Sequence, residues 1–181
     1  MSNKNLADLQ LESLARLPFA QLQGQTISAV LLALGSNYQA DYYLPHVRER
    51  LAELGQIALS SALKNPDITA TAEQPKPDYI NQSVYLALSK GMTLAQLQMF
   101  CKNLEDECAR ERAQKSKISS KPVAIARVSM DIDILMVKLK DQANSLSNNK
   151  NKWVIVAERL PLAEHERVGL KELQKKASVK T

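Results

Sequence analysis

Two aspartates spaced two residues apart are the side chains of this chain best suited to chemistry. Asp131 and Asp133 interrupt an apolar run, Met130 to Val137, that otherwise has the composition of a buried strand. Alternate side chains of a strand project from one face, so the two carboxylates would lie about 7 Å apart along the backbone. Such oxygen ligands suit Mg²⁺, which completes its shell with water and phosphate oxygens. The spacing favours a metal-bound nucleotide. The alternative is that one aspartate ends the strand and the other is solvated at an edge.

A group of basic residues precedes the aspartates. Serines and Pro122 within this segment indicate a loop rather than a helix. Two interpretations stand side by side: a solvated basic loop, and an arm of cations that closes over a triphosphate. The cations are Arg110, Arg112, Lys115, Lys117, Lys121 and Arg127, with Glu111 as the single acid among them.

Length and composition indicate one ordinary globular domain. The chain has 181 residues, of which 45% are hydrophobic and 24% charged. A net charge of +5 suits a polyphosphate ligand, and would also suit nucleic acid or an acidic membrane surface. Only 4% of the residues are aromatic, which argues against an RNA-reading sheet. No apolar run is long enough to span a bilayer and no signal peptide is visible, so we predict no membrane partner and a cytoplasmic location.

Strand and helix signals alternate along the chain. Thr93 is the expected N-cap of one helix, and Cys101 and Cys108 lie two helical turns apart, too far for a disulfide, so we expect small buried side chains. The order predicts an α+β fold, a ferredoxin-like sandwich with two helices on one side of an antiparallel sheet. The expected strands are 27–34, 57–63, 83–89, 130–137 and 153–157, and the expected helices are 44–54, 94–104 and 160–173.

Four segments, in order and with suitable spacing over residues 28–137, resemble the 6-hydroxymethyl-7,8-dihydropterin pyrophosphokinase family of folate biosynthesis. They are Ala33 to Asn37 (Ala-Leu-Gly-Ser-Asn), Tyr79 to Asn81 (Tyr-Ile-Asn), Leu104-Glu105 followed by Arg110 and Arg112, and Met130 to Leu135. The resemblance implies the ferredoxin-like fold and two substrates, ATP and the hydroxymethyl-dihydropterin. It also implies a magnesium-dependent transfer of pyrophosphate that releases AMP.

The same resemblance implies a site, residue by residue. Asp131 and Asp133 would hold two Mg²⁺ ions, and Arg110 and Arg112 would join them as catalytic groups. Asn81 would read the amide edge of the pterin, beside Tyr79 in the pocket wall. The remaining assignments are Asn65, Pro66 and Ile68 on the pterin side, and Glu105, Arg110, Arg112, Lys115, Lys121 and Arg127 on the nucleotide side.

The chain departs from the family pattern on the nucleotide side. Family members usually carry an Arg-Trp-Gly-Pro-Arg-Thr run before the aspartates and a Pro-His pair after them, and this chain has neither. Two functions therefore stay open. One is an active pyrophosphokinase with a divergent nucleotide loop, and the other is a catalytically impaired relative that binds a pterin or a protein partner. Retention of both carboxylates, Asn81 and Gly35-Ser36-Asn37 favours the active enzyme.

Residues 1–27 form an expected helical extension to a domain that spans residues 28–175. Leu6, Leu9, Leu14 and Leu17 follow helical spacing approximately. We expect this segment to dock on its own domain, and the alternative is that it forms the interface of a dimer.

Overall fold

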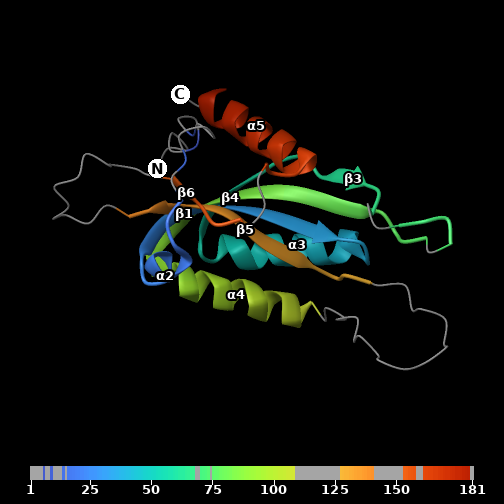
Figure 1. The fold of residues 1–181 in the computed structure, drawn as a ribbon, viewed down its shortest axis with the longest axis horizontal. Coiled ribbons are helices and arrows are strands. Elements are labelled where there is room, and N and C mark those ends of the chain that lie inside the picture. The colour runs from blue at the N-terminus through green and yellow to red at the C-terminus, as the bar shows by residue number, and fades with distance from the viewer. Residues whose placement is uncertain are drawn as a thin grey trace.

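The computed structural model is built around one antiparallel sheet of six strands, ordered β2-β4-β1-β5-β6, with β3 also paired to β4 (Figure 1). The structure describes residues 6, 9, 14, 16–67, 70–73, 75–108, 127–140, 153–157 and 161–179. The strands are β1 (Thr26–Ser36), β2 (Gly55–Leu59), β3 (Leu63–Asn65), β4 (Tyr79–Thr93), β5 (Asp131–Leu139) and β6 (Trp153–Ile155). The described helices are α2 (Phe19–Leu22), α3 (Ala40–Ala52), α4 (Leu94–Glu107) and α5 (Glu164–Val179).

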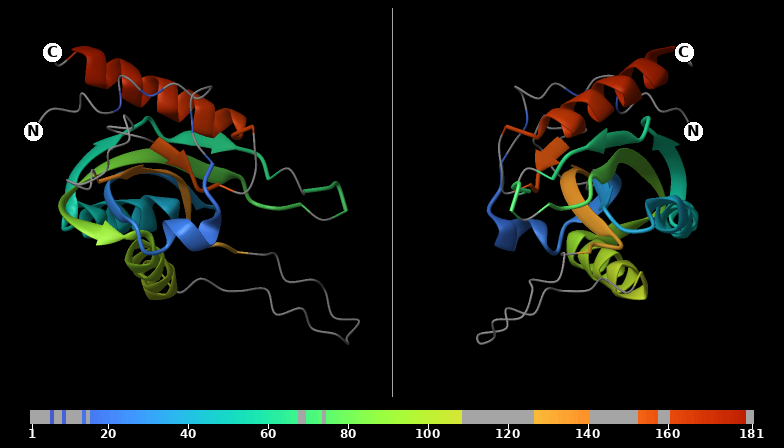
Figure 2. Two further views of the ribbon diagram at one scale, coloured as in Figure 1. Left: turned by 60° about the vertical axis from the view of Figure 1, so that its left-hand side comes forward. Right: turned by 90° about the vertical axis from the view of Figure 1, so that its right-hand side faces the viewer.

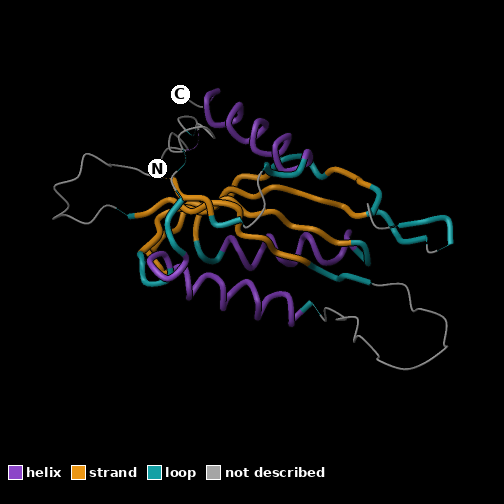
Figure 3. Tube along the Cα trace, in the orientation of Figure 1, coloured by secondary structure: helices purple, strands orange, loops and turns teal. Residues whose placement is uncertain are grey.

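Helices cover both faces of the sheet. Helices α3 and α4 lie on one face and α5 lies on the other, as Figures 1 and 2 show. The alternation of side chains along β1 explains the two layers, because Leu32 and Leu34 pack under α3 and α4 whereas Leu31 and Ala33 pack on the face of α5. The arrangement of helices and strands in Figure 3 confirms the predicted α+β sandwich.

The predicted start of α4 is confirmed. Thr93 is the N-cap, and its hydroxyl accepts the Gln96 N–H at 3.2 Å, while the Gln96 side chain accepts the Thr93 N–H at 2.8 Å. This reciprocal capping box satisfies two of the backbone donors that a helix leaves unpaired at its start. Cys101 and Cys108 are free and buried, as expected.

The strand expected at 57–63 is wrong in its extent, because the structure has two strands, β2 and β3, separated at Ser60. There the Ser60 hydroxyl accepts the Ser83 N–H at 2.9 Å, and the Ser60 carbonyl accepts Gln82 Nε2 at 2.7 Å. The Ser60 N–H still donates to the Ser83 carbonyl at 3.0 Å, but side-chain partners replace the other half of the ladder at this point. Strand β4 is longer than expected, since β1 pairs with it from Thr26 to Ser36.

The N-terminal segment contacts its own domain. Leu6 and Leu9 are buried in the core under α5, and Gln174 Nε2 of that helix donates to the Leu9 carbonyl at 2.6 Å. These contacts agree with docking of the segment on the domain. None of the described helices has the length and apolar character needed to cross a bilayer.

Helix α5 also shields the outer edge of β2. Lys176 Nζ donates to the Leu59 carbonyl at 2.8 Å, and the Glu172 carboxylate accepts the Ser61 N–H at 2.8 Å. The hydrogen bond from Lys176, and after it the one from the Ser61 N–H, lowers the pKa of Glu172. Side-chain groups therefore satisfy backbone atoms that another strand could otherwise pair with.

Replacing Gly169 with Ala should destabilise the fold, because α5 crosses β4 at this glycine. An added Cβ would lie 2.2 Å from Ser83 Oγ and 2.7 Å from Ser83 Cβ, so the helix must move away. We expect a loss of about 1 to 3 kcal/mol in the free energy of unfolding, measured by urea denaturation. Gly24→Ala is the matched control, since nothing lies within 4 Å of its added Cβ. Equal effects of the two substitutions would contradict the proposed overpacking.

Candidate active site

The polar residues expected from the sequence meet in one row across the sheet. Gly35 of β1 lies opposite Asn81 of β4 on one side and opposite Asp131 of β5 on the other. In the neighbouring row, Asn65 of β3 lies opposite Tyr79 of β4. Residues that face each other in an antiparallel pair project from the same face of the sheet. The four polar side chains therefore share the face that carries α5.

The absence of a side chain at Gly35 lets Asn81, Tyr79 and Asp131 approach one another across β1. A Cβ at this position would lie 3.1 Å from Asn81 Oδ1, 3.6 Å from Tyr79 Cδ1 and 4.0 Å from Asp131 Cβ. Space rather than backbone conformation explains the glycine, since no described glycine has a positive φ. Gly35 thus lets Asn81, expected on the pterin side, lie near Asp131, expected to bind the metal.

The two aspartates lie on one face, as the sequence predicted. Ile132, between them, packs into the core under α3 and α4, so Asp131 and Asp133 project from the other side. Asp131 is half-buried and Asp133 is exposed. The residues opposite them on β1 are small, with Gly35 facing Asp131 and Ala33 facing Asp133.

The carboxylate pair fits Mg²⁺ bound together with phosphate. Among the described residues, no group of three or more His, Cys, Asp or Glu side chains could hold a metal ion. Mg²⁺ does not need a complete protein cage, since one or two carboxylates with water and phosphate oxygens fill its octahedral shell. The donor set suits an ion delivered with a polyphosphate better than a permanently bound one.

A cavity of about 440 Å³ opens beside Asp133, between α4 and the outer edge of β5. Glu105 lines it and is almost completely buried, and its Oε1 accepts the Ile132 N–H at 2.9 Å. Burial, and after it the nearby Glu105 charge, raises the pKa of the Cys101 thiol to about 12, so this thiol stays protonated and is no nucleophile. The lining residues are Gln98, Cys101, Lys102, Glu105, Ile132, Asp133, Ile134, Val156 and Ala157.

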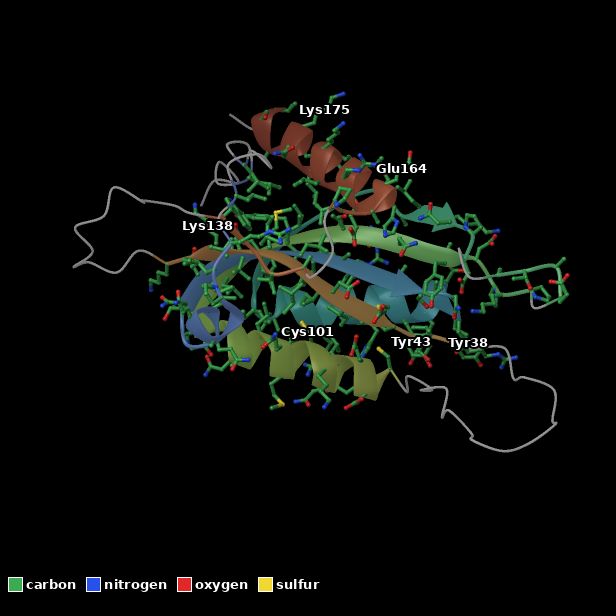
Figure 4. All side chains as sticks on the ribbon, viewed as in Figure 1. Tyr38, Tyr43, Cys101, Lys138, Glu164 and Lys175 are labelled. Atoms are coloured by element: carbon green, nitrogen blue, oxygen red, sulfur yellow. The ribbon has the colours of Figure 1, made fainter. Side chains whose placement is uncertain are left out.

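The turn after β1 holds the chain that leads into β5. The Asn37 N–H donates to the Val128 carbonyl at 3.1 Å, and the Val128 N–H donates to Asn37 Oδ1 at 2.6 Å. The Ser36 hydroxyl lies between two acceptors, the Tyr38 carbonyl at 3.1 Å and the Val128 carbonyl at 3.3 Å. Next to this contact, the Arg127 guanidinium lies 5.0 Å from the centroid of the Tyr38 ring. Figure 4 shows Tyr38 at the end of the sheet where β5 begins. The Gly-Ser-Asn segment therefore links the Asn81 row to the start of the aspartate strand.

A comparison with known families decides what this site belongs to. The family model for 7,8-dihydro-6-hydroxymethylpterin-pyrophosphokinase matches residues 31–167. The chain belongs to this family. The match runs from β1 into α5 and contains Gly35, Asn81, Glu105 and both aspartates. Membership supports a pyrophosphokinase activity in folate biosynthesis, with ATP and a pterin as the substrates that the family implies. No curated protein matches the chain in sequence.

Several residues that the pyrophosphokinase resemblance assigned lie outside the described part of the chain. These are Arg110, Arg112, Lys115, Lys121 and Ile68. Pro66 is exposed at the end of β3, and Arg127 is exposed beside Tyr38. Their contacts with substrates stay predictions.

Two features of this candidate site could not be predicted from the sequence. One is Tyr38, whose contact with Arg127 joins residues 89 positions apart and has no local signal. The other is the attachment of Ser36 and Asn37 to Val128, which explains physically why a serine and an asparagine follow Gly35. The Gly-Ser-Asn motif could be seen in the sequence, but its contact with Val128 could not.

Proposed function

We propose that the chain transfers pyrophosphate from ATP to 6-hydroxymethyl-7,8-dihydropterin in a Mg²⁺-dependent reaction. The hydroxymethyl oxygen attacks the β-phosphorus, the bond from this phosphorus to the α,β-bridging oxygen breaks, and AMP leaves. The hydroxyl proton passes to solvent. The observation that carries the proposal is the row at Gly35, which brings Asn81 and Asp131 around one glycine. A pterin held by Asn81 would then present its hydroxymethyl group toward the metal ligands.

The pterin side is formed by β3 and β4. The Asn81 carboxamide offers one acceptor and a donor to the amide edge of the ring, and Tyr79 forms the wall beside it. Asn65 adds a second argument, because its Nδ2 is buried and has no hydrogen-bond partner among the described residues. Buried donors are normally satisfied, so a carbonyl or ring nitrogen of a bound pterin is a fitting acceptor. Backbone groups of Pro66 and of residue 68 complete this side of the proposal.

The nucleotide side is formed by β5, α4 and the basic segment. Asp131 and Asp133 would hold two Mg²⁺ ions, which neutralise the charge of the phosphates and orient them when bound. The cavity that Asp133 lines together with Lys102 and Glu105 suits the nucleoside. Positioning and charge neutralisation are the main contributions that a protein makes to such a transfer. The proposed phosphate contacts are Arg110, Arg112, Lys115, Lys121 and Arg127.

A second candidate is a catalytically impaired relative that binds a pterin or a protein partner. The observation that favours it is the lack of the Arg-Trp-Gly-Pro-Arg-Thr run before the aspartates and of a Pro-His pair after them. Each lost contact to a phosphate or a base would weaken nucleotide binding by about tenfold or more.

Turnover separates the two candidates. The purified protein, mixed with the hydroxymethyl-dihydropterin, ATP and Mg²⁺, is expected to form AMP and the pterin diphosphate in equal amounts, measured by chromatography. Chelation of Mg²⁺ should stop the reaction, since the carboxylate pair alone offers no positive charge to the phosphates. Pterin binding by calorimetry without any AMP would refute the enzymatic proposal and support the impaired relative.

A further inference from the structure

Glu105 is a buried acid on α4 that accepts a hydrogen bond from the backbone of β5. Its side chain is 9% exposed, and Oε1 accepts the Ile132 N–H at 2.9 Å. Ile132 lies between the two aspartates, so Glu105 holds the peptide unit that joins Asp131 to Ile132. A hydrogen bond from a backbone amide to a buried carboxylate is charge-assisted and stronger than one between neutral groups.

The outer edge of β5 explains why this amide takes a side-chain partner. Among the described residues, β6 pairs with β5 only at Met136, Val137 and Lys138. Regular pairing ends there, since the N–H groups of Val156 and Ala157 both donate to the same acceptor, the Leu135 carbonyl. The start of β5 thus has β1 on one side, and on the other side Glu105 occupies the place of a strand partner at Ile132.

Helix α4 holds the acceptor in place. Its start is closed by the Thr93 and Gln96 capping box, and Leu97, Cys101 and Leu104 bury one face of the helix against the sheet. Glu105 lies at the end of this buried face, so its carboxylate moves only if the helix moves.

We propose that Glu105 is a positioning residue that orients Asp131 and Asp133 through the Ile132 amide. The inference rests on the proposed function, in which the two carboxylates bind Mg²⁺ with ATP. It differs from the role that the family resemblance implied, in which Glu105 contacts the nucleotide. Fixing this peptide unit fixes the backbone beside Asp131 directly, and it constrains Asp133 through the backbone of Ile132. The two carboxylates would serve ions that are strongly hydrated and have strict octahedral geometry.

The test compares Glu105→Gln with Glu105→Ala. Gln keeps an acceptor oxygen at the same distance from the backbone and lacks the charge, whereas Ala lacks the acceptor. The first readout is amide hydrogen exchange of Ile132 in the ligand-free protein, followed by NMR. We expect Ile132 to stay protected in the Gln variant and to exchange at least about tenfold faster in the Ala variant, while amides of β1 and β4 keep their protection.

The second readout is the Mg²⁺ concentration needed for half-maximal ATP binding. We expect the Ala variant to need about 10-fold to 100-fold more Mg²⁺, as found for residues that orient metal ligands, and the Gln variant to stay within about threefold of the native protein. Asp106→Ala changes the exposed neighbouring acid on α4 and serves as the matched control, with no expected effect in either readout.

Two results would overturn the proposal. One is unchanged Ile132 exchange in the Ala variant, which would mean that the hydrogen bond does not hold the strand. The other is a Glu105→Gln variant that binds ATP as weakly as Glu105→Ala although its Ile132 amide stays protected. That result would assign Glu105 a charge-dependent contact with the nucleotide or the metal. If Glu105→Ala does not fold, Glu105→Leu removes the acceptor while filling the buried space. If the native protein binds no Mg-ATP, the proposed function fails. The hydrogen bond from Ile132 to Glu105 is still tested by the exchange experiment, which uses the ligand-free protein.

Discussion

Asp131→Ala and Asp133→Ala are each expected to abolish Mg²⁺-dependent binding of ATP. Loss of either carboxylate leaves a single protein ligand for ions that release their water reluctantly. The two side chains share one face of β5, and the residues opposite them on β1, Gly35 and Ala33, carry no oxygen ligand that could replace a lost carboxylate. Calorimetric titration of each variant with ATP in the presence of Mg²⁺ measures the effect.

These two variants should remain folded, because Asp131 is only half-buried and Asp133 is exposed. Circular dichroism and a thermal melt check this point. Asp106→Ala removes an exposed acid from α4 and controls for a general change in net charge. Native ATP affinity in both aspartate variants would show that the metal site has been assigned to the wrong residues.

Asn81→Ala is expected to weaken binding of the dihydropterin by tens of fold and to leave ATP binding almost unchanged. The substitution removes the paired donor and acceptor of the carboxamide, and a loss of about 2 kcal/mol corresponds to roughly 30-fold in affinity. Asn81 lies next to Gly35 on β4, whereas the proposed metal ligands Asp131 and Asp133 lie on β5. Separate titrations with the pterin and with Mg-ATP measure the two affinities.

A companion variant sharpens this result. Asn81→Asp keeps the shape and the acceptor but replaces the donor, so pterin binding should fall while the fold is kept. Equal weakening of pterin and ATP in both variants would instead identify Asn81 as a structural residue that supports the whole row at Gly35.

Much of the fold could be predicted from local patterns. The helical stripe in α4 and its Thr93 cap depend on residues within a few positions of one another, and both appear in the structure as expected. The apolar runs of β1 and β5 likewise reveal strands, because these central strands pack on both faces. The split between β2 and β3 could not be foreseen, since it depends on Ser60 meeting Gln82 and Ser83 from a distant part of the chain.

For the candidate site, the sequence by itself determined the types of the chemical groups and the common face of Asp131 and Asp133, because a strand repeats every two residues. It also carried the resemblance to the pyrophosphokinase family through short motifs. Only the tertiary structure decided which of these groups meet. Asn81 and Asp131 lie 50 positions apart, and they share a row because β1 pairs with β4 and β5 in registers that place Gly35 between them. The alternation of apolar residues along each strand selects the face that a side chain occupies, but which residues of distant strands lie opposite one another is decided when the whole sheet packs against its helices.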